Sequence, residues 1–273
     1  INIPLLDNRE RHIVGNLYKK KNPSAATQVA HHFFLQKEEA FLKRFSPLPP
    51  PYYICCWRGG GRSRFVSSHL QTSGHQSIRV DGGYKSYRAH VRHFFEHLEK
   101  KKPSLLLIAG LTGSGKTDLL KHLAASWPVM DLEAAAQHCG SVFGHIPYNK
   151  NKDWNTVPQS LFESRVASVI KGLEHSKGPI LTEDEGRRIG RNFIPDPLYT
   201  LMRNSPRIWI DLPFNVRVDN ILNDYFANNE HEHIVSQMSI ALERLTKYIG
   251  HEAREQLIQW LSERDYNAFV EYM

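Results

Sequence analysis

The sequence predicts an α/β protein built from two linked units, each with a parallel sheet covered by helices. Short apolar runs of strand length alternate with stretches of helical periodicity, as in parallel sheets with helical crossovers. This alternation starts twice, because a lysine-rich segment ending at Pro103 separates two series of elements. We therefore place the first unit at residues 1–102 and the second at residues 103–273.

The first unit begins its alternating pattern after a proline-rich segment at 46–51. Proline fixes φ and restrains the residue before it, so this segment is expected to be extended. A strand at 52–55, a helix at 63–71 and a strand at 77–80 follow. A longer helix comes last, because Val91, Phe94, Phe95 and Leu98 recur at the spacing of one helix face.

The second unit is expected to contain four strands and a helical tail. The strands are predicted at 105–109, 129–132, 180–183 and 208–212, with helical stretches between them. From about residue 231 the chain is expected to be helical. One apolar stripe of that tail consists of Ile234, Met238, Leu242, Leu245 and Ile249.

Composition limits the class of protein. No apolar run approaches the length of a membrane span, and the longest, at 105–111, has the length of a buried strand. The chain contains 3 cysteines, two of them adjacent, and these form no disulfide framework. We therefore expect a cytoplasmic protein without a membrane partner.

Charge is distributed unevenly along the chain. Residues 1–103 carry 18 Lys and Arg against 7 Asp and Glu, a balance of +11, whereas the remaining residues carry 17 against 21, a balance of −4. A basic half beside a mildly acidic half favours a polyanionic partner on the first unit, nucleic acid above all. Lysines scattered over an ordinary soluble surface would give the same balance, so charge alone does not separate the two interpretations.

The segment 110–117 reads Gly-Leu-Thr-Gly-Ser-Gly-Lys-Thr, the full phosphate-loop pattern, between an apolar strand and a helix. Glycines let successive backbone N–H groups converge on phosphate oxygens, Lys116 adds a positive charge, and the Thr117 hydroxyl can hold Mg²⁺. A turn without function is the alternative, and the strand and helix on either side argue against it. The expected phosphate ligands are Gly110, Gly113, Ser114, Gly115, Lys116 and Thr117.

A second glycine-rich turn, at 56–63, reads Cys-Trp-Arg-Gly-Gly-Gly-Arg-Ser. Backbone donors, Arg58, Arg62 and a helix start would together lower the pKa of a cysteine at this place. We therefore expect Cys56 to be a nucleophile whose loop holds an oxyanion, as in rhodaneses and cysteine phosphatases. A buried structural cysteine is the alternative, and it suits Cys55 better, because that residue still lies in the strand and is expected to pack with a high pKa.

Carboxylates at the predicted strand ends are weaker candidates. A P-loop protein places its magnesium-binding or water-orienting carboxylate at such a strand end. A solvated, charged strand end is the alternative for each of them. The acidic or metal-binding candidates are Asp131, Glu183 and Glu185, with Glu133 and Asp184 beside them.

Other polar residues are less informative. Arg187, Arg188 and Arg191 either close on phosphate or form a solvated basic turn. His138 and Cys139 are too isolated for a metal site and are expected to pack. The 15 histidines show no spacing typical of metal ligands.

Taken together, the motifs resemble those of bacterial tRNA 2-selenouridine synthase, a family in which a rhodanese domain is fused to a P-loop domain. They occur in the family's order over almost the whole chain. The matching stretches are CWRGGGRS at 56–63, GGYKSYR at 82–88, GLTGSGKT at 110–117, DLE at 131–133, GSVFG at 140–144, FESR at 162–165 and EDEGRRIGRNFIP at 183–195.

The resemblance implies a two-step reaction on 2-thiouridine at the wobble position of certain tRNAs. A geranyl group passes from geranyl diphosphate to the sulfur, and selenium from selenophosphate then replaces the S-geranyl group. Cys56 would be needed for selenium transfer, with a perselenide as one route, and the loop at 110–117 would hold a phosphate or diphosphate. No tightly bound cofactor is implied, ATP binding is left open, and Lys85, Arg88, Arg187 and Arg188 are expected to contact anions or tRNA.

This sequence departs from the family pattern in three places. The family's rhodanese domain starts with a strand and an Asp-x-Arg segment, and residues 1–20 resemble the sequence that follows them. We therefore expect a rhodanese-like unit that is incomplete at its N-terminus. Gly61 stands where a larger residue is usual, and Gly186 stands where serine is common.

Two other functions remain open from the sequence. A P-loop kinase or NTPase with an inert rhodanese appendage would turn over ATP without tRNA. A non-catalytic tRNA-binding remnant would bind tRNA without modifying it. A cysteine phosphatase is less favoured, because no segment supplies an obvious general-acid loop.

Overall fold

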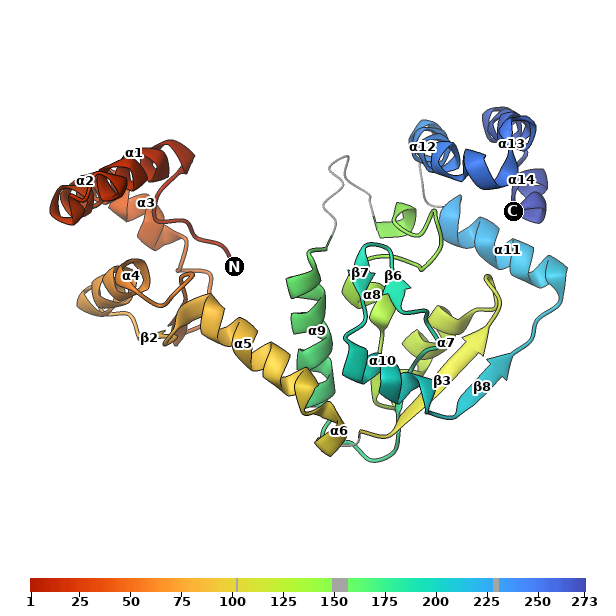
Figure 1. Cartoon of the computed structure of the whole chain (residues 1–273), viewed down its shortest axis with the longest axis horizontal. Coiled ribbons are helices and arrows are strands. Elements are labelled where there is room, and N and C mark those ends of the chain that lie inside the picture. The colour runs from red at the N-terminus through yellow and green to blue at the C-terminus, as the bar shows by residue number, and fades with distance from the viewer. Residues whose placement is uncertain (102, 149–156, 228–230) are drawn as a thin grey trace. The chain divides into compact units, whose positions relative to one another are not determined.

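The computed structural model describes residues 1–101, 103–148, 157–227 and 231–273. These residues form two compact units, Ile1–His90 and Val91–Met273 (Figure 1). The division falls inside one helix, α5 (Gly83–Glu96), whose last turns belong to the core of the second unit. The predicted boundary at residue 102 lies outside the described residues and stays a prediction.

Three helices open the first unit, in a stretch for which the sequence pattern predicted no elements. Asp7 caps the first of them in a capping box with Glu10, and Asn22 caps the second, with Pro23 as its first residue. Their bounds are Asn8–Lys19 for α1, Pro23–Leu35 for α2 and Glu38–Lys43 for α3.

The remainder of the first unit follows the predicted alternation. The two strands pair in parallel, with Tyr52 opposite Ser77, and helix α4 connects them. Phe34 of α2 and Leu70 of α4 are buried in the same hydrophobic core. The bounds are Tyr52–Ile54 for β1, Gly61–Thr72 for α4 and Ser77–Arg79 for β2. A rhodanese-like fold for this unit stays a prediction, because the sheet has only these two strands among the described residues.

The second unit contains a four-stranded sheet in the order β4-β5-β3-β8, and all three pairs are parallel. The four predicted strands are thus confirmed. The connection from β3 leads to β4 on one side, whereas the connection from β5 leads to β8 on the other side, so the crossovers leave the neighbouring strands β3 and β5 in opposite directions. Ligands of open α/β sheets bind at the carboxyl ends of strands beside such a reversal. The bounds are Leu105–Gly110 for β3, Val129–Met130 for β4, Ile180–Glu183 for β5 and Arg207–Ile210 for β8.

Helices cover this sheet and continue into the tail, as Figure 1 shows. The bounds are Leu98–Lys101 for α6, Lys116–Leu123 for α7, Leu132–Ala136 for α8, Ile146–Tyr148 for the 3₁₀ helix η1, Gln159–Gly172 for α9, Asp196–Arg203 for α10 and Phe214–Tyr225 for α11. A short antiparallel hairpin, β6 (Arg188–Ile189) and β7 (Asn192–Phe193), was not predicted.

The predicted helical tail is confirmed. Its helices are α12 (His231–Ile249), α13 (His251–Glu263) and α14 (Tyr266–Tyr272). Ile234, Met238 and Leu242 of the predicted stripe are buried in one core with residues of α11, α13 and α14. No helix in the described part of the chain is long and apolar enough to cross a bilayer.

Candidate functional site

The turn at 56–63, here called the cysteine loop, joins β1 to α4. Partial burial disfavours the ionised form of Cys56 and by itself would raise the pKa of its thiol. Hydrogen bonds from the Ser63 side chain and from backbone groups of Ser63, Arg58 and Gly60 outweigh burial and lower the pKa of Cys56 to about 7. The Cys56 Sγ lies 3.2 Å from Ser63 Oγ. About half of the Cys56 thiol is therefore ionised near neutral pH, as a nucleophile requires.

The other two cysteines differ from Cys56. Cys55 is exposed, so the expectation that it packs in the core is wrong: β1 ends at Ile54, and Cys55 already belongs to the turn. Partial burial and the neighbouring Cys56 nevertheless raise the pKa of Cys55, in the expected direction. Burial raises the pKa of Cys139 strongly, which agrees with its expected packing role.

A second motif holds the cysteine loop in place. The backbone N–H of Tyr84 donates to the Cys56 carbonyl at 2.9 Å, and that of Lys85 donates to the Trp57 carbonyl at 2.9 Å. Gly83 has a left-handed φ of +61°, and a Cβ there would lie 2.1 Å from the Cys56 oxygen. The start of α5, which carries the predicted Lys85 and Arg88, is therefore fixed against the loop.

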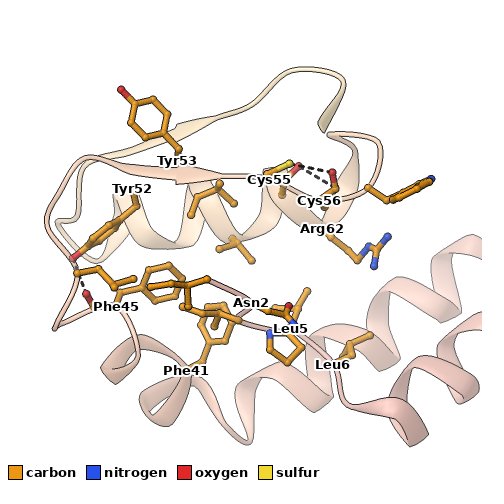
Figure 2. Close-up of a pocket in the computed structure, with 18 of the residues that line it drawn as sticks. Asn2, Leu5, Leu6, Phe41, Phe45, Tyr52, Tyr53, Cys55, Cys56 and Arg62 are labelled. Carbon is orange, nitrogen blue, oxygen red and sulfur yellow. Dashed lines mark hydrogen bonds between the residues drawn. The ribbon is translucent and has the colours of Figure 1, made fainter. Parts of the chain in front are cut away.

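A cavity of about 490 Å³ adjoins the cysteine loop and is lined in part by residues of the N-terminal segment and of α3. Cys56 and Arg62 line the same end of it (Figure 2). Arg62 is thus in reach of an anion held beside the thiol. Arg58 lowers the pKa of Cys56 through a hydrogen bond from its backbone.

Three aromatic residues lie beside the cysteine loop, of which Trp57 and Tyr87 are exposed, and the sequence motifs did not single them out. The Trp57 and Tyr84 rings lie 5.6 Å apart between centroids, and the Tyr84 and Tyr87 rings lie 6.1 Å apart. Trp57 is 56% exposed beside the nucleophile. Its position directly after Cys56, with tyrosines three residues apart at 84 and 87, was a signal that the sequence did contain.

The segment 110–117, here called the phosphate loop, joins β3 to α7 at the carboxyl edge of the sheet. Gly113 has a left-handed φ of +77°, and a Cβ there would lie 2.4 Å from the Arg217 carbonyl oxygen. Asn220 of α11 donates from Nδ2 to the Gly113 carbonyl at 2.7 Å, so α11 supports the loop. Lys116 Nζ donates to the Gly110 and Leu111 carbonyls at 2.9 and 3.1 Å, which holds its charge at the loop.

Two carboxyl groups from different strand ends meet beside the phosphate loop. The Thr117 hydroxyl donates to Glu133 Oε2 at 3.0 Å, and Glu133 shares a hydrogen bond with Glu185. Burial, with Glu185 as the next cause, raises the pKa of Glu133 to about 7, and burial also raises the pKa of Glu185. A cation at this place would relieve the repulsion, and an all-oxygen donor set of this kind suits Mg²⁺.

The remaining acidic candidates have structural partners. Asp131 caps α8 by accepting the Ala134 N–H at 2.7 Å, and Asp184 pairs with Arg207 at 2.8 Å. Glu183 is fully buried, and its Oε2 accepts the Leu132 N–H at 3.3 Å. Burial, followed by Asp131, raises the pKa of Glu183 to about 8. Glu183 Oε1 is buried without a hydrogen-bond partner in the described residues.

The arginine group follows β5 and lies around the β6–β7 hairpin. Arg187 pairs with Asp196 at 2.6 Å, and Arg188 donates to the Gly190 carbonyl at 2.6 Å. These partners hold the two guanidinium groups at the surface, where contact with phosphate remains a prediction. His138 packs against Gly144 and Gly190, as expected of a packing residue.

An apolar cavity of about 540 Å³ opens beside the phosphate loop. Leu111 and Thr112 of the loop line it together with Phe214, Arg217 and Ile221 of α11, and residues of α14 close the other side. Its volume lies within the range of small-molecule pockets, about 300–1,000 Å³. An anion on the loop and an apolar group in this cavity would be adjacent.

Comparison with known proteins shows to which family this chain belongs. A family model described as the tRNA 2-selenouridine synthase AAA domain matches residues 103–270. The chain belongs to the tRNA 2-selenouridine synthase family. Curated relatives named tRNA 2-selenouridine synthase extend the similarity into the first unit.

The protein from Bdellovibrio bacteriovorus is 38% identical to this chain over 239 residues, covering 84% of this chain and 60% of the relative. That from Nitrosomonas eutropha is 34% identical over 240 residues, covering 83% and 58%. That from Pseudomonas putida is 32% identical over 282 residues, covering 96% and 73%. The chain thus spans about six tenths of the length of the first two of these tRNA 2-selenouridine synthases. No solved structure matches the chain.

Proposed function

We propose that this chain converts wobble 2-thiouridine of tRNA into 2-selenouridine through an S-geranyl intermediate, using geranyl diphosphate and selenophosphate. The observation that carries the proposal is the apolar cavity beside the phosphate loop, because a prenyl diphosphate needs an anion site and an apolar site in contact. The curated relatives are named for the final product. Their name and the two loops together favour two steps with two different substrates.

In the first step the phosphate loop binds the diphosphate and the cavity binds the ten-carbon chain. The thiocarbonyl sulfur attacks C1 of the geranyl group, the C1–O bond breaks, and diphosphate leaves with the electron pair while the base loses its N3 proton. Lys116 would balance the charge that develops on the leaving group. Thr117, Glu133 and Glu185 would hold Mg²⁺, which supplies further charge neutralisation when bound.

In the second step selenium replaces the S-geranyl group at C2 of the base. We assign this step to Cys56, because the cysteine loop lowers the pKa of its thiol to about 7. The Cys56 thiolate adds at C2 and expels geranylthiolate, and selenide from selenophosphate then displaces Cys56 while the P–Se bond is hydrolysed to phosphate. A Cys56 perselenide would carry selenium two electrons more oxidised than selenophosphate does, so we favour the direct displacement.

The experiment supplies the protein with thiolated tRNA, geranyl diphosphate, selenophosphate and Mg²⁺ and identifies the nucleosides by mass. Wild type should yield first S-geranyl-2-thiouridine and then 2-selenouridine. Lys116→Ala should lose geranylation but still exchange selenium into tRNA that is already geranylated. Geranylation at the wild-type rate by folded Lys116→Ala would place the diphosphate elsewhere.

The two competing functions give different results in the same experiment. Rapid ATP hydrolysis without tRNA and no change in the nucleosides would indicate an NTPase. Tight tRNA binding with no new nucleoside under any substrate combination would indicate a binding protein.

A further inference from the structure

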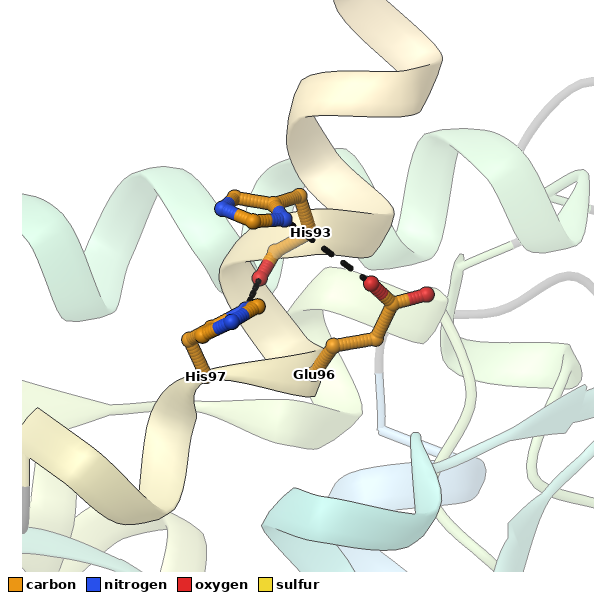
Figure 3. A group of neighbouring side chains, drawn as sticks. All are labelled: His93, Glu96 and His97. Carbon is orange, nitrogen blue, oxygen red and sulfur yellow. Dashed lines mark hydrogen bonds and ion pairs between the residues drawn. The ribbon is translucent and has the colours of Figure 1, made fainter.

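Three side chains at the end of α5 lie close enough to share a metal ion. His93, Glu96 and His97 each offer one ligand atom, and the three atoms lie within 4.8 Å of one another. Figure 3 shows the two imidazoles and the carboxylate gathered on one side of the chain where the helix ends. His93 Nδ1 lies 3.9 Å from Glu96 Oε2. The expectation that no histidines of this chain have ligand spacing is therefore wrong.

Helical periodicity produces this arrangement. Residues four apart lie on the same face of a helix, one turn above the other, and residue 96 lies three beyond residue 93. The two imidazole centroids are accordingly only 4.0 Å apart. The sequence His-Phe-Phe-Glu-His places the two buried phenylalanines of the core between the polar ligands. The packing of Phe94 and Phe95 therefore turns His93, Glu96 and His97 outward together.

A hydrogen bond orients one of the ligands. His97 Nδ1 lies 3.0 Å from the His93 carbonyl oxygen, and because a carbonyl only accepts, Nδ1 carries the proton. The lone pair of His97 is then on Nε2. Histidines that bind metals almost always donate their other ring N–H to a carbonyl or carboxylate in this way.

We infer that His93, Glu96 and His97 form a site for a divalent transition metal, with Zn²⁺ as the ion whose ligand chemistry fits best. Two imidazole nitrogens and one carboxylate oxygen are a common three-ligand set for Zn²⁺, with water in the fourth position. Zinc–nitrogen bonds of about 2.0–2.1 Å require the ligand atoms to approach by roughly 1 Å. His93 and Glu96 are exposed, so their side chains can make this rotation without repacking the core.

The local electrostatics also favour a cation. The last carbonyl groups of a helix carry a partial negative charge, and the three ligands lie in the last turn of α5 and directly after it. The nearby Lys101 ammonium forms an ion pair with Glu174, which directs its charge toward that carboxylate. A bound ion would join the last turn of α5 to the residue that begins the connection to α6. The site would therefore fix that turn.

The test titrates the full chain, without a histidine tag, with Zn²⁺ and follows binding by calorimetry and melting by circular dichroism. We expect one high-affinity Zn²⁺ per chain and a rise in melting temperature with Zn²⁺ concentration. His93→Ala and His97→Ala should each weaken binding at least about tenfold and remove the thermal shift. Glu96→Gln should weaken binding less than either histidine variant.

Two controls separate this site from other ligands. His122 is matched to His97, because its Nδ1 also lies 2.8 Å from the carbonyl of the residue four before it, but no second histidine lies one turn away. His122→Ala and the double variant Cys55→Ser/Cys56→Ser should both keep wild-type Zn²⁺ affinity. Unchanged affinity in His93→Ala and His97→Ala, or lost affinity in the cysteine variant, would overturn the assignment.

Discussion

Two adjacent cysteines differ in the hydrogen bonds that they receive. Ser63 and three backbone groups lower the pKa of Cys56 to about 7, whereas partial burial and Cys56 raise that of Cys55. Near pH 7 Cys56 should therefore react with iodoacetamide first, since an unperturbed thiol near roughly 8.5 is mostly protonated there. Peptide mass spectrometry of briefly labelled protein measures the order.

The same difference predicts the effect on activity. Cys56→Ser should abolish selenium exchange while geranylation and tRNA binding persist. Cys55→Ser is the matched control, and it should exchange selenium at close to the wild-type rate because Cys55 is exposed. First labelling at Cys55, or exchange by Cys56→Ser, contradicts the assignment of the nucleophile.

Glu183 should make stability depend on pH. Its folded pKa of about 8 exceeds the ordinary 4.5. Between these values the folded state binds the extra proton, so stability falls as pH rises from about 4.5 to 8, by on the order of 1 kcal/mol per pH unit at most. Glu183→Gln keeps an oxygen acceptor for the Leu132 N–H and removes the charge. The variant should therefore gain stability over wild type as pH rises through this window.

Urea unfolding at pH 5, 6, 7 and 8 measures this difference. Asp184→Asn is the neighbouring control, since Asp184 pairs with Arg207 instead of lying fully buried. A difference between Glu183→Gln and wild type that does not change with pH would show that Glu183 is ionised in the folded chain throughout.

The positions of the two loops could be predicted from the sequence because their geometry is local, and the roles of their residues stay predictions. A glycine-rich turn between a strand and a helix places its own backbone donors, and no distant residue needs to be known. Glu133 was considered but not chosen, because its contact with Thr117 depends on the sheet order β4-β5-β3. The order of the strands in the sheet cannot be read from the spacing of residues along the chain. Cys55 was misplaced by a strand end only one residue earlier than predicted.

We expect Trp57 and the start of α5 to provide a stacking surface for an unstacked base. Trp57, Tyr84 and Tyr87 form a row of neighbouring rings beside the cysteine loop, and Lys85 and Arg88 lie on the same helix. Stacking of a base on an aromatic ring contributes roughly 1–3 kcal/mol. Trp57→Ala should therefore weaken binding of an anticodon stem-loop by about 5- to 150-fold, and Trp57→Phe should retain most of the affinity.

Tyr53→Ala is the control for this surface. Tyr53 is 68% exposed on β1, and its ring points away from Cys56 and Arg62 in Figure 2, so its loss should leave stem-loop affinity unchanged. Fluorescence anisotropy with a labelled stem-loop measures all three variants. Equal losses in Trp57→Ala and Tyr53→Ala would indicate a general effect on the unit instead of stacking.

Elements were predicted well where apolar residues recur at a clear period. β3, β5 and the helices of the tail are buried on a regular stripe or throughout, and their positions agree with the sequence pattern. α1 to α3 were missed because each buries only one or two residues, so the apolar period is weak. Their capping residues, Asp7 with Glu10 and Asn22 with Pro23, were the available signal.

At the scale of the whole molecule, the uneven charge predicts how tRNA binding depends on salt. Residues 1–103 have a charge balance of +11. If their basic side chains neutralise about six phosphates, the affinity for tRNA should fall by roughly 10³ between about 50 and 200 mM salt. Lys19, Lys20 and Lys21 are all exposed. Replacing the three lysines with glutamate should weaken tRNA binding and make the affinity depend less steeply on salt concentration. The phosphate loop should bind diphosphate as before. Filter binding over a salt series measures the slope, and a flat response contradicts binding through the phosphate backbone.

Because α5 contributes to both units, a stable fragment of the second unit cannot start at residue 103, where the match to the family model begins. A fragment starting at residue 103 would lack Val91, Phe94, Phe95 and Leu98, all buried in the core of the second unit. Each such side chain contributes about 1.5–3 kcal/mol, so their loss approaches the whole stability of a typical domain, about 5–15 kcal/mol. We expect the fragment 103–273 to aggregate on expression and the fragment 83–273 to remain folded, as size-exclusion chromatography and circular dichroism can determine. The hydrophobic segment upstream of the phosphate loop is thus an integral part of the domain that dissection must preserve.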